Sequence, residues 1–431
     1  MYKDYLKLTI PNVLTNLTVP LVSLVDVFLM GHLDGPQFII AIGLSVAIFN
    51  MLYWAFGFLR MGTTGMVAQY FGRNDNDGIQ KVVIQGLIIA IILGVLFVCF
   101  QKTILLASRS IMDVSSDTFI LISDYFRIRI FAAPASIILF VINGWLLGVH
   151  KSKVALYLAL VINTVNIALS YVLVKFYGLG IEGAAIGTLI AQYSGLLIGV
   201  GLLLKSYPLK WYIFFKESFG ANSSWKSFIQ VNSNLFIRTL CLLFTLTFFK
   251  INAAEFGVTI GAGNLLLLEF ISLSAYGIDG LAFAAESISG RYFGLRNLKQ
   301  LKKSITVAFQ IGLIIGAIGS AIFFFLGELI LEVLTNQQEV INASIPYLPW
   351  VIVAPILHSF AYVWDGIYIG CTASKQMKWS LLISTIGVFL PSYYLFSHLF
   401  GNHGVWLSIT LFMLSRGLIQ TILVKSIYKR L

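Results

Sequence analysis

The sequence predicts an all-α polytopic membrane protein, with twelve transmembrane helices in two pseudo-symmetric six-helix bundles. Three observations lead to this prediction. Hydrophobic residues make up 58% of the 431 residues and charged residues only 11%, whereas a soluble domain carries about 25% charged residues. Apolar runs of about twenty residues recur, each long enough to cross ~30 Å of hydrocarbon. The second half of the chain also repeats motifs of the first half at nearly constant spacing.

The apolar runs fall six to a copy. The spans predicted for the first copy are 8–32, 38–66, 81–101, 119–148, 154–175 and 182–204. Those predicted for the second copy are 228–251, 257–290, 304–327, 340–370, 377–398 and 404–426. Because the runs are continuous rather than alternating, a membrane β-barrel is excluded.

The internal repeat is carried by short motifs. Those with a shared offset of 222 residues are Asn143-Gly144, Tyr70-Phe71-Gly72 and Tyr125, which return as Asp365-Gly366, Tyr292-Phe293-Gly294 and Tyr347. Gly183 returns as Gly404, one residue closer. Duplicated apolar chains are typical of secondary transporters, whose transport path lies between the copies.

The charged loops predict the topology. If loops alternate between the two sides, about twenty Lys and Arg residues fall on the side of the N-terminus, and only Lys102, Arg109, Lys175 and Lys250 fall on the other. This bias predicts that both termini are cytoplasmic and that the chain is a multi-pass protein of the inner (cytoplasmic) membrane. It also explains the net charge of +11 without a nucleic-acid partner.

The predicted domains are an N-terminal six-helix lobe over 1–205, a cytoplasmic linker over 206–226 and a C-terminal six-helix lobe over 227–431. With six spans per copy, both copies enter from the same side, so they are parallel repeats related by an axis along the membrane normal. We expect two bundles that face each other across a central cleft, in a monomer.

The sequence shows no motif for catalysis, for a metal or for an organic cofactor. The three cysteines lie in predicted spans or, for Cys371, directly after one, without disulfide or metal-ligand spacing. No Ser-His-Asp, His-Glu-x-x-His or phosphate-binding glycine motif is present. We therefore expect neither an enzyme nor an ATP-driven pump.

Ionisable side chains inside the spans are the candidates for function, because a charge at the bilayer centre costs roughly 2.5–3.5 kcal/mol. The acids are Asp26, Glu269, Asp279, Glu286 and Asp365, and the bases are Arg60, Arg127, Arg129, Arg238 and Arg416. Each is either a functional group or half of an ion pair. Arg127 and Arg129 have a nearby partner in sequence, because Asp124 is close enough to neutralise them.

Asp26 is the main candidate for proton coupling. It lies in the first span, roughly 9 Å below the outer surface at 1.5 Å per residue. Counting along the fifth and sixth spans places Asn166, Ser170 and Thr188 at a similar depth. Burial favours the protonated form of a carboxyl group, and an amide and two hydroxyls can hold either form. The alternative is a buried acid with no coupling role.

Pro20 precedes Asp26 by six residues in the same span. Proline frees a backbone carbonyl and permits a kink. A bend that depends on the protonation of Asp26 would convert proton binding into a change of cavity shape. Proline is also common in membrane helices that have no such role.

The second copy carries its own polar set. Arg238, Asp279 and Asp365 map to the cytoplasmic halves of the seventh, eighth and tenth spans, and Glu269 lies nearer mid-membrane. They form either a structural ion pair or triad, or a site for substrate or a second cation. Asp365 is favoured as functional because its repeat partner, Asn143, is neutral.

Several segments resemble the multidrug and toxic compound extrusion (MATE) family, in particular its DinF branch. They are Val25-Asp26-Val27-Phe28-Leu29-Met30-Gly31-His32-Leu33, Phe58-Leu59-Arg60-Met61-Gly62-Thr63-Thr64-Gly65, Gly144-Trp145-Leu146-Leu147-Gly148-Val149, and Asp365-Gly366 with Ile369-Gly370. The likeness covers essentially the whole chain.

The resemblance implies a two-lobed, twelve-helix antiporter that exports amphipathic, often cationic compounds in exchange for protons or sodium. It implies that Asp26 is the coupling acid of the first helix, that Asn166 and Thr188 belong to its pocket, and that Asp365 is an acid used by some branches. Ser170 departs from the pattern, because many relatives have a second aspartate there. A sodium site wants anionic oxygens, so the serine favours a proton site with a single acid.

The main alternative is a flippase for lipid-linked saccharides, which has a related architecture. Such proteins tend to have additional helices and a cavity lined by cationic residues. This chain has twelve predicted spans and few bases that could face a cleft. A membrane-embedded enzyme is a third possibility, although the sequence offers no catalytic set.

Overall fold

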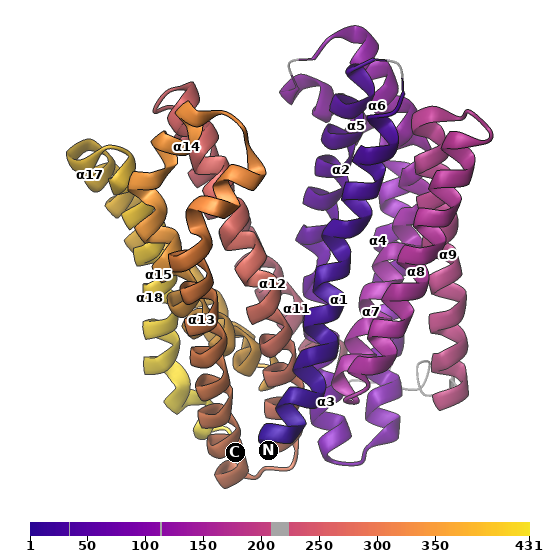
Figure 1. The fold of residues 1–431 in the computed structure, drawn as a ribbon. Coiled ribbons are helices and arrows are strands. Elements are labelled where there is room, and N and C mark those ends of the chain that lie inside the picture. Colours follow the sequence, from indigo (N-terminus) through magenta and orange to yellow (C-terminus); the bar gives the residue numbers. More distant parts are fainter. Residues whose placement is uncertain (34, 113, 208–223) are drawn as a thin grey trace. The chain divides into compact units, whose positions relative to one another are not determined.

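A computed structural model describes residues 1–33, 35–112, 114–207 and 224–431 (Figure 1). Throughout these ranges the regular elements are helices. Most of the predicted linker over 206–226 lies outside the described residues.

The predicted spans are confirmed, since twelve helical segments of the described ranges are long and apolar enough to cross a membrane. They are Tyr2–Met30, Gln37–Gly72, Asn76–Cys99, Ser116–Gly148, Ser152–Lys175, Gly180–Ser206, Trp225–Ala253, Val258–Gly294, Leu298–Leu334, Gln338–Gly370, Ser374–Phe400 and Asn402–Tyr428. Many extend beyond the predicted bounds, because polar helix ends continue into the loops where hydropathy no longer marks them.

Four of the spans contain internal breaks. The second consists of α2 (Gln37–Phe56) and α3 (Phe58–Gly72), and the fourth of α6 (Ser116–Arg129), a 3-10 turn at Ile130–Ala132 and α7 (Ala133–Gly148). In the second copy, α14 (Gln338–Ser344), a 3-10 turn at Ile345–Tyr347 and α15 (Leu348–Gly370) form the tenth span, and α16 (Ser374–Leu382), a π-helix at Ile383–Phe389 and α17 (Leu390–Phe400) form the eleventh. Proline stands in the first turn of both α7 and α15, where its missing N–H costs nothing.

The chain divides into two compact units. Unit 1 comprises Met1–Val13, Ala68–Arg73 and Ile229–Leu431, and unit 2 comprises Leu14–Val67 and Asn74–Phe228. The long helix α1 (Tyr2–Met30) therefore begins in unit 1 and ends in unit 2. The last residues of α3 likewise belong to the unit that holds the second copy.

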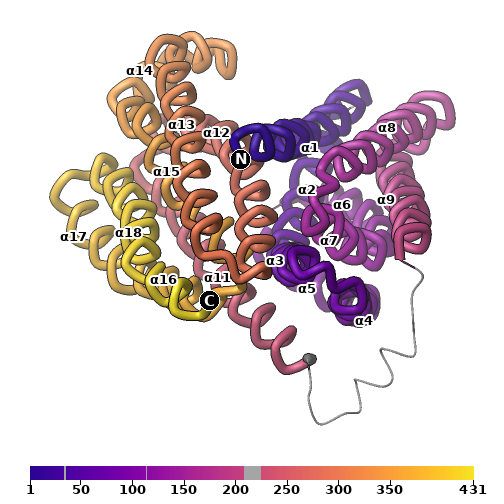
Figure 2. Tube along the Cα trace, turned by 90° about the horizontal axis from the view of Figure 1, so that it is seen from below, coloured from indigo at the N-terminus to yellow at the C-terminus, as the bar shows by residue number. Residues whose placement is uncertain are grey.

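Unit 2 is a bundle in which α4 (Asn76–Cys99) packs on α7, and α8 (Ser152–Lys175) packs on α9 (Gly180–Ser206). Figure 2, seen along the helices, shows α8 beside α9. Gly187 of α9 lets the two helices approach closely, because a Cβ at that position would lie 2.8 Å from the backbone nitrogen of Ser170. The short α5 (Gln101–Ile111) buries none of its residues.

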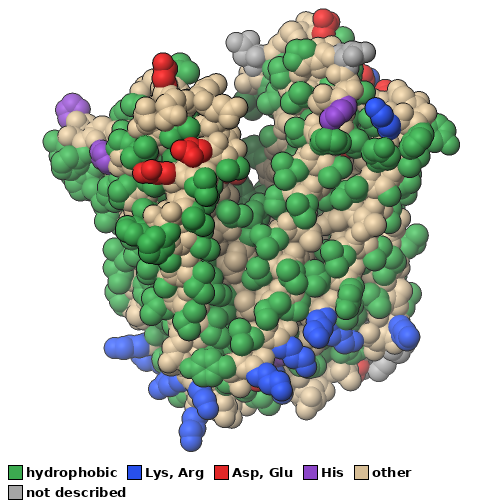
Figure 3. Space-filling model, viewed as in Figure 1, with side chains coloured by type: hydrophobic (Ala, Val, Ile, Leu, Met, Phe, Trp, Pro, Cys, Tyr) green, Lys and Arg blue, Asp and Glu red, His purple; other side chains and the backbone are tan. Residues whose placement is uncertain are grey.

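Unit 1 is built around three helices that pack against one another, α12 (Val258–Gly294), α13 (Leu298–Leu334) and α15. Helix α18 (Asn402–Tyr428) covers α15 and also packs on α17, and α11 (Ser224–Ala253) completes the unit. Both chain termini lie at the same end of unit 1 (Figure 1). On the face that Figure 3 shows, Lys and Arg side chains gather at this end of unit 1, and acidic side chains lie at its opposite end.

Candidate functional site

Asp26 is buried in unit 2, near the end of α1, with only 1% of its surface exposed. Its Oδ1 atom is shielded from solvent and makes no hydrogen bond with the described residues. A carboxylate oxygen in this position lacks the hydrogen-bond donor that normally compensates a buried polar atom. The position therefore suits an acid that exchanges a proton.

A cation lies near this carboxyl group, and two phenols lie beside the cation. Arg129, at the end of α6, acts on Asp26 electrostatically, without a hydrogen bond between them. The guanidinium donates a hydrogen bond to the Tyr125 hydroxyl and lies over the rings of Phe49 and Tyr125, with its carbon 5.0 Å and 5.5 Å from the two centroids. The hydroxyl of Tyr53 on α2 is also close to Arg129.

The amide and the two hydroxyls predicted near Asp26 lie at the interface of α8 and α9. Asn166 Nδ2 donates to Thr188 Oγ1 at 2.8 Å, and that hydroxyl donates to the carbonyl of Ala184 at 3.0 Å. Ser170 lies one turn further along α8, against Gly187. Asn166 Oδ1 and Ser170 Oγ are buried without a hydrogen-bond partner among the described residues.

A contact between α1 and α8 relates these two groups in depth. Asn163 Nδ2 donates to the carbonyl of Thr18 at 3.5 Å, and the first and fifth spans run in the same direction. At 1.5 Å per residue, Asp26 lies about 12 Å beyond Thr18 and Ser170 about 10.5 Å beyond Asn163. By this count Asp26 and Ser170 lie at about the same level, and Asn166 lies about one turn deeper. The assignment of these residues to ion coupling stays a prediction.

Pro20 lies inside α1, which runs as one helix from Tyr2 to Met30. It stands between the contact at Thr18 and the buried Asp26. A proline at this point removes one backbone hydrogen bond of the helix. Its role as a bending point stays a prediction.

The polar set of the second copy contains an ion pair in unit 1. Asp365 of α15 accepts from Arg238 of α11 and, at 2.5 Å, from Arg416 of α18. Gln420 Nε2 donates to the other carboxylate oxygen at 2.8 Å. All four residues are at least 95% buried. The structure thus shows the ion pair that the sequence left open as one alternative for Asp365 and Arg238.

The other two acids of that set lie along α12. Glu269 is exposed and Asp279 is partly buried, and the hydroxyl of Tyr276 is within electrostatic reach of both. Asp279 also acts on Tyr362 of α15, whose ring lies 5.7 Å from the guanidinium carbon of Arg416. Asp279 is therefore near the ion pair, whereas Glu269 is further toward the start of the helix.

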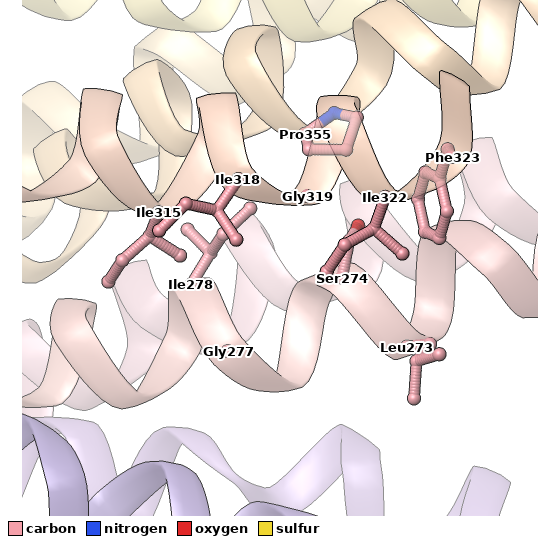
Figure 4. Close-up of a pocket in the computed structure, with 10 residues that line it drawn as sticks. All are labelled: Leu273, Ser274, Gly277, Ile278, Ile315, Ile318, Gly319, Ile322, Phe323 and Pro355. Carbon is pink, nitrogen blue, oxygen red and sulfur yellow. The ribbon is translucent and has the colours of Figure 1, made fainter. Parts of the chain in front are cut away.

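A separate apolar pocket of about 210 Å³ lies halfway along α12 and α13 (Figure 4). Its lining residues are Leu273, Ser274, Gly277, Ile278, Ile315, Ile318, Gly319, Ile322, Phe323 and Pro355. Drug-sized ligands occupy sites of roughly 300–1,000 Å³. This pocket is too small to hold such a ligand whole, and it contains no ionisable group.

Sequence reasoning missed two partners. It assigned Arg129 to Asp124 because they are close in sequence, whereas the ionisable groups that act on Arg129 are Tyr125, Tyr53 and Asp26. It also grouped Asp365 with Arg238, which does contact it, and with Asp279, but missed the contacts with Arg416 and Gln420. A count of the charges within the spans would have shown that Arg129 and Arg416 each need a partner. It would not have shown which residue that partner is.

Comparison with known proteins agrees with this architecture. A family model described as MatE matches residues 11–172 and 236–395. DNA damage-inducible protein F of Escherichia coli (strain K12) is 30% identical over 411 residues, which cover 95% of this chain and 89% of that protein. Protein DETOXIFICATION 44, chloroplastic, of Arabidopsis thaliana is 28% identical and covers 96% of this chain and 80% of that protein.

Solved structures show the same fold. One described as the outward-facing conformation of a multidrug resistance MATE family transporter of the MOP superfamily has a TM-score of 0.90 at 22% identity, covering 100% of this chain and 96% of that chain. Another, described as MATE in complex with MaD3S, has a TM-score of 0.88 at 21% identity, covering 99% and 97%.

Proposed function

The chain belongs to the MatE family of multidrug and toxic compound extrusion transporters, and we propose that it exports amphipathic, often cationic small molecules in exchange for protons. It is a multi-pass membrane transporter rather than an enzyme. The twelve spans in the described ranges favour this function over the saccharide flippase, which tends to have more helices.

The observation that carries the proposal is the buried, unpartnered carboxyl oxygen of Asp26. An ionised side chain in the membrane costs free energy, so a carboxyl group there gains stability by taking up a proton and becoming neutral. The neutral side chains of Asn166, Ser170 and Thr188 tolerate either form of the acid. Protonation from outside, followed by a bend of α1 at Pro20, would rearrange the surroundings of Asp26 in unit 2 and release the substrate.

The single acid also decides which coupling ion we propose. A sodium ion is bound best by several oxygens, some of them anionic, and Ser170 supplies only a neutral hydroxyl. A proton needs one carboxyl oxygen. We therefore propose the proton as the coupling ion, with no metal and no organic cofactor, and sodium is the alternative that the experiment must exclude.

The driving force for this exchange is modest. One proton exchanged for one monovalent cation moves no net charge, so the membrane potential does not contribute. The pH gradient supplies about 1.4 kcal/mol per unit. Steeper accumulation requires more protons per cycle or a substrate with less positive charge.

For the substrate itself, we propose that Glu269 and Asp279 of α12 attract its positive charge. Asp365 is less suited to this task because it already pairs with Arg238 and Arg416, and Arg238 is itself a cation. The chain is proposed to work as a monomer in the inner membrane, with the small molecule and the bilayer as its partners.

Replacing Asp26 with asparagine tests the proposal. We expect Asp26→Asn to fold normally but to lose export of a cationic dye such as ethidium, because the amide keeps the shape of the side chain without exchanging a proton. The measurement is dye transport by purified protein in liposomes under an imposed pH gradient. The rate should fall to that of liposomes without protein.

Asp117→Asn is the matched control, because Asp117 is an exposed acid in the first turn of α6. It should transport like the wild type. Full transport by Asp26→Asn would remove Asp26 from the mechanism. Transport driven by a sodium gradient at equal pH, but not by a pH gradient, would replace the proton by sodium.

A further inference from the structure

Arg129 is a cation that the transport cycle described so far does not use. It is the last residue of α6, immediately before the 3-10 turn at Ile130–Ala132. A cation at a helix C-terminus is favourably placed relative to the helix dipole. The ring of Phe49 and the ring and hydroxyl of Tyr125 hold the guanidinium, and we call these two residues the aromatic cage.

The cage leaves the guanidinium incompletely satisfied. Its Nε atom is shielded from solvent and has no hydrogen-bond partner among the described residues. An arginine keeps its proton in proteins, so this positive charge inside a span needs an acid. The ionisable groups that act on it are the phenols of Tyr125 and Tyr53 and the carboxyl of Asp26.

The carboxyl group of Asp26 lacks a hydrogen-bond donor on one oxygen, as the guanidinium of Arg129 lacks an acceptor for its Nε atom. Its Oδ1 acceptor is buried and unpartnered, and Arg129 is the charged group that acts on it. Tyr125 and Tyr53 are the other ionisable groups around this pair, and the polar residues of α8 and α9 at or within about a turn of this level, Asn166, Ser170 and Thr188, are uncharged. An unused donor and an unused acceptor of opposite charge therefore lie near each other without contact.

We propose that Arg129 is the exchangeable counter-ion of Asp26. When Asp26 releases its proton to water, the carboxylate attracts Arg129 out of the aromatic cage and pairs with it. When Asp26 takes up a proton, Arg129 returns to Phe49 and Tyr125, which is the arrangement of this structure. The proposal rests on the proposed proton exchange and adds the group that responds to it.

This exchange has a consequence for the transported molecule. A deprotonated Asp26 paired with Arg129 presents no net charge to a molecule bound beside it in unit 2. A cationic substrate would then gain little from Asp26 itself, and selection in this unit would rest on apolar and hydrogen-bonding contacts.

The test is a pH titration of the carboxyl group in the full-length protein. Infrared difference spectra of the purified transporter in lipid show the C=O stretch of a protonated carboxyl group, and the part of this band that is missing in Asp26→Asn belongs to Asp26. The readout needs no substrate and no transport.

Two variants should move the midpoint of that titration in opposite directions. Arg129→Gln removes the cation that stabilises the carboxylate, so the band should persist to higher pH, by at least about tenfold in proton concentration. Tyr125→Phe removes a hydrogen bond of the aromatic cage and releases Arg129 toward Asp26, so the midpoint should fall. Arg129→Lys should lie near the wild type.

Arg127→Gln is the matched control, because Arg127 is an exposed arginine two residues earlier on α6. It should titrate like the wild type. An unchanged titration midpoint in Arg129→Gln, or a higher midpoint in Tyr125→Phe, would overturn the proposal that Arg129 is the counter-ion. A wild-type band that depends on Asp26 but does not change with pH would instead overturn the proton exchange itself.

Discussion

At the scale of single residues, Asp365 is a buried charge with several compensating partners. One carboxylate lies between two guanidiniums and also accepts from Gln420. The cluster keeps an excess of one positive charge, and the Nε atoms of both arginines remain unpartnered. Removing one partner of such a buried set is far more costly than the set is worth as a whole. Its contacts are those of a structural centre that joins α11, α15 and α18.

We expect Asp365→Ala to lower the free energy of unfolding by about 3–5 kcal/mol, because two buried arginines lose their shared acid. Asp365→Asn should lose less, since the amide oxygen can still accept from Gln420. The measurement is the thermal unfolding of the purified protein, with Glu328→Gln on the exposed face of α13 as the control. A variant Asp365→Ala with the stability of the wild type and weakened dye binding would show a substrate site instead.

The sequence identifies candidate residues better than it identifies their partners. Asp26, Asp365 and the intramembrane arginines stand out because charge is rare in these spans. Which residue faces which depends on the rotation of each helix about its axis, which a broad apolar pattern does not define. Arg129 illustrates the limit, because Asp124 is near in sequence whereas Asp26 is near in space.

At the scale of helices, the duplicated Tyr-Phe-Gly motif has a structural reason. Its two copies meet in unit 1, at the ends of α3 and α12. A Cβ on Gly72 would meet the carbonyl oxygen of Arg291, and one on Gly294 would meet that of Gln69. Arg73 Nε donates to the carbonyl of Gly294 at 3.2 Å. Each glycine thus gives the backbone of the other helix room to approach.

We expect Gly72→Ala to destabilise this crossing by about 1–3 kcal/mol, because the added methyl group must displace a rigid backbone carbonyl. Gly201→Ala is the control, since a Cβ at that helical glycine would meet nothing within 4 Å and alanine favours helix. Thermal unfolding in the same lipid compares the two variants. Equal stability would mean that α3 and α12 do not depend on the glycine contact.

Hydropathy predicts where the spans are but not where they break. The twelve spans follow from runs of apolar residues, which the bilayer requires regardless of how the helices pack. The 3-10 turns at Ile130–Ala132 and Ile345–Tyr347 and the π-helix at Ile383–Phe389 leave no mark in hydropathy. One of these breaks ends α6 at Arg129, so it helps to position a residue of the candidate site.

At the scale of the whole molecule, the boundary between the two sequence repeats differs from the boundary between the two compact units. The first thirteen residues and the end of α3 belong to the unit of the second copy. The offset of 222 residues could not predict this division, because it shows which positions of the two copies correspond and not which residues are in contact. Helices α1 and α3 therefore each contribute to both units.

The bias of basic residues leads to a prediction about orientation, which concerns the entire chain. Cysteine introduced at Lys429, near the C-terminus, should be hidden from a membrane-impermeant maleimide in right-side-out vesicles, and cysteine at Tyr177 should be labelled. Both positions are exposed, so only sidedness separates them. Native background is low at Cys371, because burial raises the pKa of its thiol to about 12 and the thiolate is the reactive form. With Cys99 and Cys241 replaced by alanine, labelling at Lys429→Cys but not at Tyr177→Cys would invert the topology and place the outer-third position of Asp26 on the cytoplasmic side.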